Sequence, residues 1–406
     1  MEKGGGTIMK TLIKSVHVWQ AGVFEINDVV VEDKKIVSLG SGSRDADMGQ
    51  VIDGRGKYLL PGVIDCHAHS TMVCGVRHMQ EFFAANESML TINSVIHAEK
   101  MARCGITAIR DCGGRWMETL AVRDSIQAGK LIGPRMLCSG TPIKVIGGHE
   151  PGTDITGPYE ARAKVREMVR LGVDFIKVMV TGGLGKPGEK PGRVEMEQEE
   201  LDAIVSEAAR HGRKVACHCH SREGMELLVH AGAASIEHST YLDPEINKKI
   251  MEKGIYVVPT FEPYMNYAFL GEKHGQMTDT VLAARAIVEE KKERLYEAYC
   301  QGVKLAFGRD SGGFMMDQGD FVEEMLYMEK AGISRADIIQ SATKNAADLL
   351  GILDKTGTIA RGKDADLILL GENPLENLSA YRDSLKGVWV QGQYLPAGTR
   401  EKPCDR

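Results

Sequence analysis

A repeated order of amphipathic helix, glycine and short apolar strand runs through the middle of the chain. Residues 199–210 illustrate the helical part, because Leu201, Ile204, Val205 and Ala208 recur at the spacing of one helix face. A glycine suits the end of such a helix, where a left-handed residue lets the last carbonyl groups find partners. An apolar strand then follows. Six units have this order, with their glycines at positions 105, 172, 212, 232, 254 and 302.

Two further apolar stretches, at residues 61–66 and 134–138, bring the predicted strands of this region to eight. Apolar strands that alternate with helices indicate a parallel sheet that is covered by helices on both faces. Eight such units over about 290 residues are typical of a (β/α)8 barrel, or TIM barrel. We therefore predict an α/β fold in which residues 61–354 form a TIM barrel.

The two ends of the chain have a different pattern, with short strands and no helical period. The predicted strands lie at residues 12–19, 28–31 and 35–39 before the barrel, and at 357–359, 365–370 and 387–390 after it. Neither group has enough strands to fold alone. We therefore expect both groups to form one small β-sandwich domain from residues 9–60 and 355–402, with the barrel inserted between them.

Composition and charge narrow the class of protein. With 43% hydrophobic residues the chain can bury a large core, and its net charge of −6 provides no basic surface for nucleic acid. No window approaches the roughly 18 apolar residues of a membrane span, and the first residues lack the apolar stretch of a signal peptide. The nine cysteines form no CxxC pair. A cytoplasmic protein with reduced thiols, and with neither nucleic acid nor membrane as a partner, is the simplest interpretation.

Metal-binding residue types stand where the predicted barrel strands end. The first strand leads to His67 and His69, which share one face because residues two apart in a strand point the same way. Taken alone, a His-x-His pair is about as often a pair of ordinary polar residues as a pair of metal ligands. Chemistry in a TIM barrel gathers at the carboxyl ends of the strands, however, and four other strands supply further residues there. They are Lys177 on the fourth strand, His218 and His220 on the fifth, His238 on the sixth and Asp310 after the eighth.

Lys177 has a specific use beside a group of histidines. It lies in an apolar strand, where an unpaired ammonium group is costly. A lysine amine that stays neutral can react with carbon dioxide, and the resulting carbamate is an anion that bridges two divalent cations. Two such ions roughly 3.5–4 Å apart would share an activated hydroxide. Asp310 would then ligate one ion and accept the proton of that hydroxide as it attacks.

The motifs around these residues resemble the amidohydrolase superfamily over nearly the whole chain. Within it the sequence is most similar to the prolidase-like and imidazolonepropionase-like branch, whose members cleave Xaa-Pro and other Xaa-amino-acid peptides and related N-acyl compounds. The matching segments are LPGVIDCHAH (60–69), GITAIRDCGG (105–114), DFIKVMVTGG (174–183), VACHCHSREG (215–224), SIEHST (235–240), FGRDSGG (307–313) and the tail ATKNAADLLGI…GTIARGKDADLILL (342–370).

This resemblance implies a centre of two divalent metal ions, with zinc as the expected metal. Imidazole and carboxylate ligands also accept manganese, cobalt or iron. The implied ligands are His67, His69 and Asp310 for one ion, His218 and His238 for the other, and carboxylated Lys177 as the bridge. His220 is the alternative ligand on the fifth strand; otherwise it supports the ligands or faces the substrate.

The same resemblance indicates residues that contact the substrate. His149, after the third strand, would donate a hydrogen bond to the scissile carbonyl oxygen as it becomes an oxyanion, and its alternative is a solvated histidine in a turn. Tyr241 is a candidate for binding a substrate carboxylate. Arg309 stands where the branch usually has a small residue, and it would be either structural or a bidentate partner of a carboxylate. Aromatic residues in the long linker 261–280 would either close the pocket or pack on the barrel.

We therefore predict a metal-dependent hydrolase that cleaves an amide C–N bond. Metal-bound hydroxide would attack the carbonyl carbon, and Asp310 would carry the proton to the leaving nitrogen. The expected substrate is a small molecule, either a dipeptide (Xaa-Pro or similar) or an N-acyl amino acid. Association into a homo-oligomer is compatible with the exposed helices of a barrel.

Three alternatives remain open at this point. A cyclic amidase of the imidazolonepropionase type would use a similar site. A deaminase is suggested by His220-Ser221-Arg222-Glu223, the His-x-x-Glu signature of mononuclear deaminases in the same superfamily, although those enzymes lack the lysine on the fourth strand. Glu223 also suits the first turn of a helix. A catalytically dead barrel scaffold is the alternative outside enzymes, and such relatives usually lose metal ligands, whereas no expected ligand is missing here.

Overall fold

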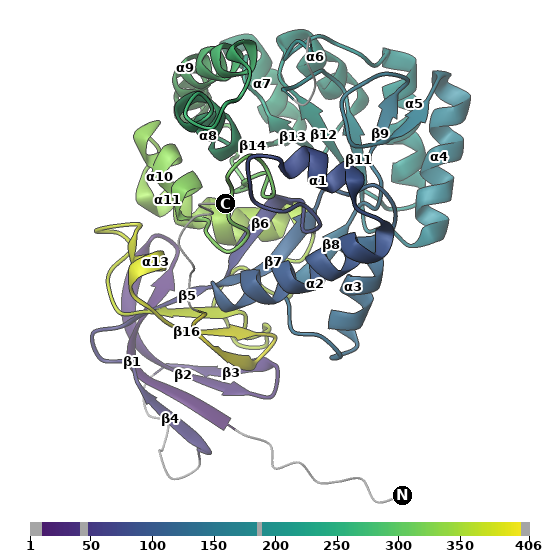
Figure 1. Ribbon diagram of the computed structural model, residues 1–406. Coiled ribbons are helices and arrows are strands. Elements are labelled where there is room, and N and C mark those ends of the chain that lie inside the picture. Colours follow the sequence, from purple (N-terminus) through teal and green to yellow (C-terminus); the bar gives the residue numbers. More distant parts are fainter. Residues whose placement is uncertain (1–9, 41–47, 185–188, 399–406) are drawn as a thin grey trace, which may run out of the picture.

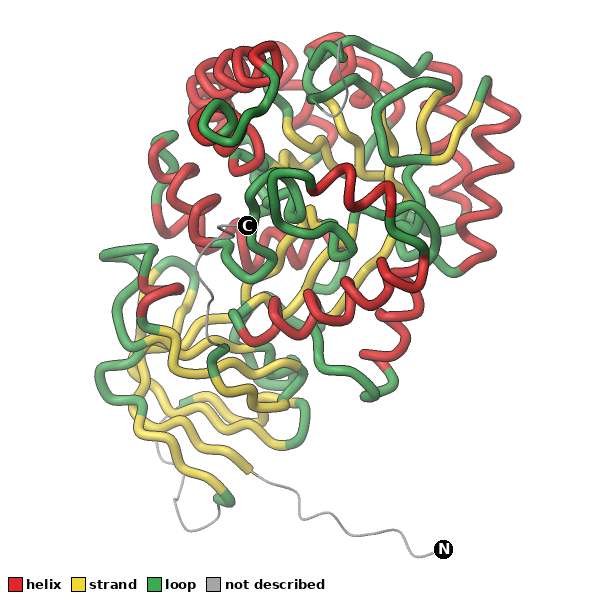
Figure 2. The backbone as a smooth tube through the Cα atoms, in the orientation of Figure 1, coloured by secondary structure: helices red, strands yellow, loops and turns green. Residues whose placement is uncertain are grey.

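The computed structural model describes residues 10–40, 48–184 and 189–398. Positions 9 and 399–402, at the expected ends of the β-sandwich domain, lie outside the described residues. In Figure 1, helices surround short strands in one part of the molecule, and the first strands (purple) lie beside the last strands (yellow) in the other. Figure 2 shows that helices are concentrated in the first part and strands dominate the second.

Eight strands from the two chain ends form one sheet. Its order is β17-β16-β15-β5-β1-β2-β3, and β4 pairs with β1. β5 connects the two ends of the chain, because it pairs with β1 on one side and antiparallel with β15 on the other. The strands are β1 (Lys10–Gln20), β2 (Val23–Glu32), β3 (Lys35–Leu39), β4 (Gln50–Asp53), β5 (Tyr58–Pro61), β15 (Leu367–Leu370), β16 (Leu385–Val390) and β17 (Gln393–Pro396).

The two ends thus meet as predicted, in one continuous hydrogen-bonded sheet. β1 has two neighbours on one side: its first half pairs with β4 and its second half with β5. One side chain cluster of the sheet, which includes Val29 and Trp389, forms a core of its own. Leu60 and Ile368 belong instead to the large core shared with the helical part, so the sheet also packs against that part.

Parallel strands form the framework of the helical part. One sheet has the order β6-β7-β8, and the other has the order β10-β9-β11-β12-β13-β14. Seven of the eight predicted strands are confirmed, and β9 and β10 are short additions in the linker after β8. The strands are β6 (Val63–Ala68), β7 (Ile106–Asp111), β8 (Arg135–Cys138), β9 (Ile143–Val145), β10 (Thr153–Ile155), β11 (Ile176–Met179), β12 (Val215–Cys219), β13 (Ser235–His238) and β14 (Tyr256–Val258).

Helices follow the strands, and five of them end at a left-handed glycine, as the pattern predicts. These glycines are Gly172, Gly232, Gly254, Gly302 and Gly351. The helices are α1 (His78–Ala84), α2 (Glu87–Arg103), α3 (Glu118–Gln127), α4 (Gly157–Leu171), α5 (Gln198–Arg210), α6 (Arg222–Ala231), α7 (Pro244–Lys253), α8 (Glu262–Leu270), α9 (Thr278–Gln301), α10 (Val322–Lys330), α11 (Arg335–Gln340), the π-helical turn η2 (Ser341–Asn345), α12 (Ala346–Leu350) and α13 (Ala380–Asp383).

The predicted eighth strand, at residues 303–308, is an extended segment without a regular ladder. Leu305 forms an isolated parallel bridge to Val257, and Ser311, just after this segment, forms one to Ala68. The ladder is interrupted because the N–H of Phe307 donates to the Ser341 carbonyl at 3.0 Å instead of to a strand. The segment nevertheless lies between β14 and β6, since it bonds to both.

No helix in the described ranges is both long enough and apolar enough to cross a membrane.

Candidate metal centre and active site

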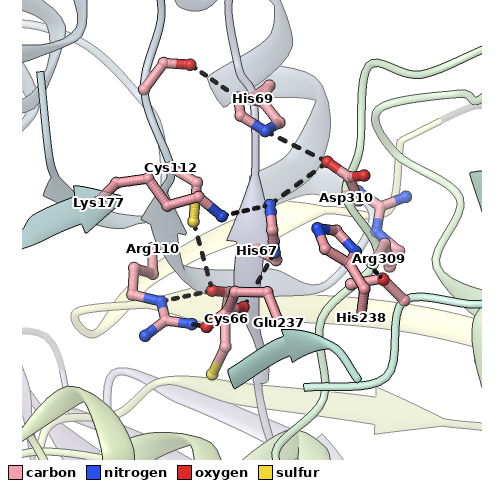
Figure 3. Close-up of polar contacts among 12 residues, drawn as sticks. Cys66, His67, His69, Arg110, Cys112, Lys177, Glu237, His238, Arg309 and Asp310 are labelled. Carbon is pink, nitrogen blue, oxygen red and sulfur yellow. Dashed lines mark hydrogen bonds and ion pairs between the residues drawn. The ribbon is translucent and has the colours of Figure 1, made fainter. Parts of the chain in front are cut away.

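His67 and His69 converge with Asp310 at the carboxyl end of β6 (Figure 3). The Nε2 atoms of His67 and His69 lie 3.4 and 3.2 Å from Asp310 Oδ1. One ligand atom from each of the three residues lies within 4.8 Å of the others, so the group can hold a metal ion. The carboxylate stays ionised, because both histidines and Lys177 hold the pKa of Asp310 below its usual range although burial alone would raise it.

Lys177, His218 and His238 adjoin this group on the side of β11, β12 and β13. Lys177 is buried, and its Nζ lies 3.2 Å from His67 Nε2. The rings of His218 and His238 are 4.4 Å apart, and that of His238 is 5.1 Å from His67. The six predicted ligands therefore line one cavity. Burial lowers the pKa of His218 and of His238, so both rings are neutral, which is the form that binds metals.

Hydrogen bonds on the outer side of the histidines orient their inner nitrogens. The Nδ1 atoms of three rings bond to protein oxygens: His67 to Glu237 at 2.9 Å, His69 to Gly113 at 2.7 Å and His238 to Thr260 at 2.7 Å. Each ring thus turns Nε2 toward the cavity. His218 is reversed, because its Nε2 lies 3.5 Å from the Gly182 carbonyl and Nδ1 remains for a ligand. Ligating histidines usually have such outer partners, so this donor set fits divalent metal ions.

Glu237 is a site residue that the sequence analysis did not identify. Its carboxylate is fully buried and contacts His67, Arg110 at 2.7 Å and Ser235. Burial alone would raise the pKa of Glu237, but Arg110 and His67 lower it to about 2, so the group is ionised. The sequence does contain one signal for this pair: Arg110 and Glu237 are charged residues inside the apolar strands β7 and β13. The alternation of side chains in a strand does not tell which buried charges meet across strands.

Three strand or loop ends in the site have left-handed backbone conformations. The φ angles are +69° at His238, +52° at Thr260 and +61° at Asp310. Such angles are uncommon for residues other than glycine, and for a β-branched threonine they are a genuine outlier. Strain of this kind tends to gather at functional sites, where surrounding structure enforces it. Here it turns His238 and Asp310 toward the cavity and brings Thr260 under His238.

His220 supports the site without lining it. The ring is fully buried, and its two nitrogens contact Thr240 Oγ1 at 2.8 Å and Tyr264 Oη at 3.1 Å. Neither nitrogen is left for a metal or a substrate. This favours His218 as the ligand on β12 and argues against a substrate-facing His220. Glu223, the acid of the deaminase signature, is exposed in the first turn of α6 and does not line the cavity.

His149 lies in the cavity as the sequence predicts. Its ring stacks on His218 at 4.2 Å, and its Nδ1 contacts Glu189 Oε1 at 2.6 Å. The backbone N–H of His149 donates to Glu195 at 2.9 Å. Glu189 and Glu195, from the linker after β11, thus hold the loop that carries His149 in place. Both were missed, since loop contacts across 40 and 46 residues leave no periodic signal.

Arg309 and Tyr241, the two candidates for binding a substrate carboxylate, do not line the cavity. Arg309 is fully buried outside the cavity and donates to Asp65 at 2.9 Å and to three backbone carbonyls, those of Asp317, Gln318 and Asp320. With its guanidinium thus occupied, it takes the structural role and not the role of binding a substrate carboxylate. Tyr241 also does not line the cavity; its ring lies near Gly192.

Residues 262–270 form the helix α8, where the sequence predicted a long linker. The buried Glu324 carboxylate explains the helix start, because it accepts the N–H groups of Phe261 and Glu262 at 2.8 and 2.7 Å. Tyr264 and Tyr267 line the cavity from α8. Phe261 is buried outside the cavity lining and Phe269 is exposed, so the predicted aromatic stretch divides between closing the pocket and other positions.

Comparisons with known proteins add to this geometry. The sequence pattern of the amidohydrolase family matches residues 58–395. Ochratoxinase from Aspergillus niger is 28% identical over 410 residues, which cover 90% of this chain and 82% of the relative. Imidazolonepropionase from Mesorhizobium japonicum is 22% identical, with 87% and 89% covered. A crystal structure of a Xaa-Pro dipeptidase with methionine bound in its active site superposes with a TM-score of 0.87 at 32% identity, and covers 95% of this chain and 100% of that one.

The buried ion pair between Arg309 and Asp65 provides a test of the corrected role. Arg309→Met leaves Asp65 buried without its charge partner, so we expect a loss of about 3–5 kcal/mol in the free energy of unfolding, measured by urea denaturation. Arg55→Met is the matched control, because it breaks an exposed ion pair with Asp53 and should have little effect. Equal losses in the two variants would contradict the structural role of Arg309.

Proposed function

Because the chain belongs to the amidohydrolase family, we propose that it is a hydrolase with two metal ions that cleaves the amide C–N bond of a dipeptide or an N-acyl amino acid. One observation carries the proposal: five strand ends bring imidazole nitrogens, a carboxylate and a buried lysine to a single cavity. The relatives support the choice of bond, since they include a Xaa-Pro dipeptidase and an ochratoxinase.

The ligand set divides into two groups that share Lys177. His67, His69 and Asp310 would hold one ion, while His218 and His238 would hold the other. Lys177 lies within reach of His67 and, as a carbamate, would bridge the two ions. Zinc suits this mixture of imidazole and carboxylate ligands. When bound, the ions would polarise the scissile carbonyl group and make a water molecule more acidic.

Asp310 and His149 are the residues of the chain that we assign to catalysis. The Asp310 carboxylate faces the cavity in its ionised form, so it can accept a proton from the attacking water and deliver it to the leaving nitrogen. His149 lines the same cavity and is oriented through Nδ1 by Glu189. Its other nitrogen would donate a hydrogen bond to the carbonyl oxygen as negative charge develops there.

We also propose that the parallel strands close into one (β/α)8 barrel over residues 61–354. Two contacts between the sheets support closure: the N–H of Asp174 donates to Cys138 at 2.8 Å, and the segment before Asp310 bonds to both β14 and β6. The sheet of the chain ends, within 9–60 and 355–402, would be a separate domain, as its own side chain core suggests.

The test of the function is hydrolysis of a panel of Xaa-Pro dipeptides, N-acyl amino acids and a cyclic imidazolone, with amino acid and ammonia release both measured. We expect free amino acid from the first two groups, loss of activity with a chelator and recovery with zinc. Hydrolysis of the imidazolone alone would favour a cyclic amidase, and ammonia as the only product would favour a deaminase. No product from a protein that carries two metal ions would contradict catalysis altogether.

Lys177 provides the test of the bridge. Lys177→Ala should reduce bound metal from two ions to at most one per chain, and it should reduce kcat/KM by about a hundredfold or more, since even outer partners of ligands contribute 10- to 100-fold. Metal analysis and kinetics on the substrate found in the panel measure both effects. Lys304→Ala, at an exposed lysine that contacts the Tyr256 ring, is the control and should retain both ions. Two ions and full activity in Lys177→Ala would contradict the bridging carbamate.

A further inference from the structure

Two buried charged side chains hold the segment directly after β14. Lys291 comes from α9 and Glu324 from α10, and they are 1% and 0% exposed. The Lys291 amine also lies over two aromatic rings, 5.1 Å from the centre of Phe261 and 4.8 Å from that of Tyr264. Burial lowers the pKa of Lys291 to about 7, and the Glu324 carboxylate partly opposes this shift. Burying such a group is costly, which suggests that it makes a specific contact.

Together the two side chains bind both polar atoms of one peptide group, the one between Thr260 and Phe261. Lys291 Nζ donates to the Thr260 carbonyl at 3.1 Å. On the other side of the same peptide group, Glu324 Oε1 accepts the Phe261 N–H at 2.8 Å. The second oxygen of Glu324 accepts the N–H of Glu262 at 2.7 Å. Two helices that are distant in the sequence therefore fix the plane of this peptide group.

The orientation of this peptide group matters because the backbone of Thr260 is strained. Its φ angle of +52° lies in the left-handed region, where a β-branched residue is a genuine outlier. Such a conformation persists only where the surrounding structure enforces it. The plane of the peptide group that follows Thr260 sets the ψ angle of this residue. Lys291 and Glu324 therefore restrain the strained residue directly.

Thr260 in turn orients a proposed metal ligand. Its Oγ1 atom lies 2.7 Å from His238 Nδ1, and this contact leaves Nε2 of the ring for the cavity. Thr260 is 0% and His238 2% exposed, so no bulk water can replace the hydroxyl as a partner. If the peptide group turned, the hydroxyl would move away, and the ring would lose the contact that selects its tautomer.

We propose that Lys291 and Glu324 are positioning residues, which act through Thr260. They hold the ring of His238 in the orientation that binds a metal ion. This inference rests on the proposed function, because it concerns the ion at His238. The other proposed ion, in the group of Asp310, has ligands with different outer partners and should not depend on Lys291 and Glu324.

The experiment measures how tightly the folded protein holds zinc, without any substrate. Zinc-loaded wild type, Lys291→Met and Thr260→Val are titrated with a chelator, which gives a Kd for each ion. Methionine removes the donor but keeps an unbranched stem, and valine removes the hydroxyl but keeps the branched shape. We expect each variant to raise the Kd of one ion by about tenfold or more, as for a lost outer partner of a ligand, and to leave the other nearly unchanged. Anomalous diffraction should identify the weakened ion as the one at His238.

A double variant tests the route from Lys291 to the ion. If Lys291 acts through Thr260, Lys291→Met combined with Thr260→Val should weaken the ion no further than Thr260→Val alone. Val29→Ala is the control for lost stability, because Val29 is fully buried in the separate core of the chain-end sheet. It should lower the thermal unfolding temperature and change neither Kd. Additive losses in the double variant, equal weakening of both ions, or no weakening would overturn the proposal.

Because no substrate is used, a failure to find hydrolysis leaves this test intact. If the wild type holds fewer than two zinc ions, the proposed metal centre fails, and NMR of the ring nitrogens tests the positioning independently, with His238→Gln to assign the signals. We then expect one tautomer of His238 in the wild type and a mixture in Lys291→Met, and an unchanged tautomer would overturn the proposal. If Lys291→Met does not fold, as judged by thermal unfolding, Lys291→Met with Glu324→Gln replaces it, because the double change removes both charges of the buried pair.

Discussion

The buried Glu237 carboxylate is shared by three strands, and the geometry of the candidate metal centre depends on it. It accepts hydrogen bonds from His67 on β6, from Arg110 on β7 and from Ser235 on its own strand β13. A buried charge without partners is very unfavourable, so each contact restrains the position of the others. The bond to His67 sets which ring nitrogen faces the cavity. Arg110 also donates to the Cys66 carbonyl, which fixes the backbone directly before that histidine.

A second buried pair supports the same strand from its other side. Asp65 accepts the backbone N–H of His67 as well as the guanidinium of Arg309, and Arg309 in turn holds the carbonyls of the loop at residues 317–320. The segment that carries Asp310 is therefore tied to β6 by an ion pair, although it has no regular ladder. The backbone N–H of Asp310 also donates to the His67 carbonyl at 2.7 Å. The ion pair and this hydrogen bond together keep the Asp310 carboxylate close to His67 and His69.

Much of the framework follows from local pattern. Seven parallel strands could be predicted, five of them because each is a short apolar run after a helix and a glycine, and the candidate metal ligands could be predicted because they stand at strand ends. The eighth was predicted where an extended segment does lie between β14 and β6, but the lack of a regular ladder could not be predicted, since the N–H of Phe307 donates to the Ser341 carbonyl, a contact that no local pattern reveals. The role of Arg309 stayed open for a similar reason. The sequence places it directly before Asp310, but it does not show that the 317–320 loop folds around its guanidinium group. Glu237 and Glu189 were missed because their partners His67 and His149 are distant in the chain.

The central claim is that two metal ions lie in this cavity with Lys177 between them. Anomalous diffraction from crystals of the zinc-loaded protein, recorded on both sides of the zinc absorption edge, tests it most directly. The account predicts two zinc peaks, one at His67, His69 and Asp310 and one at His218 and His238, with carbamate density on Lys177 in contact with both. A single peak, or two peaks with an unmodified Lys177 in contact with neither, would contradict it.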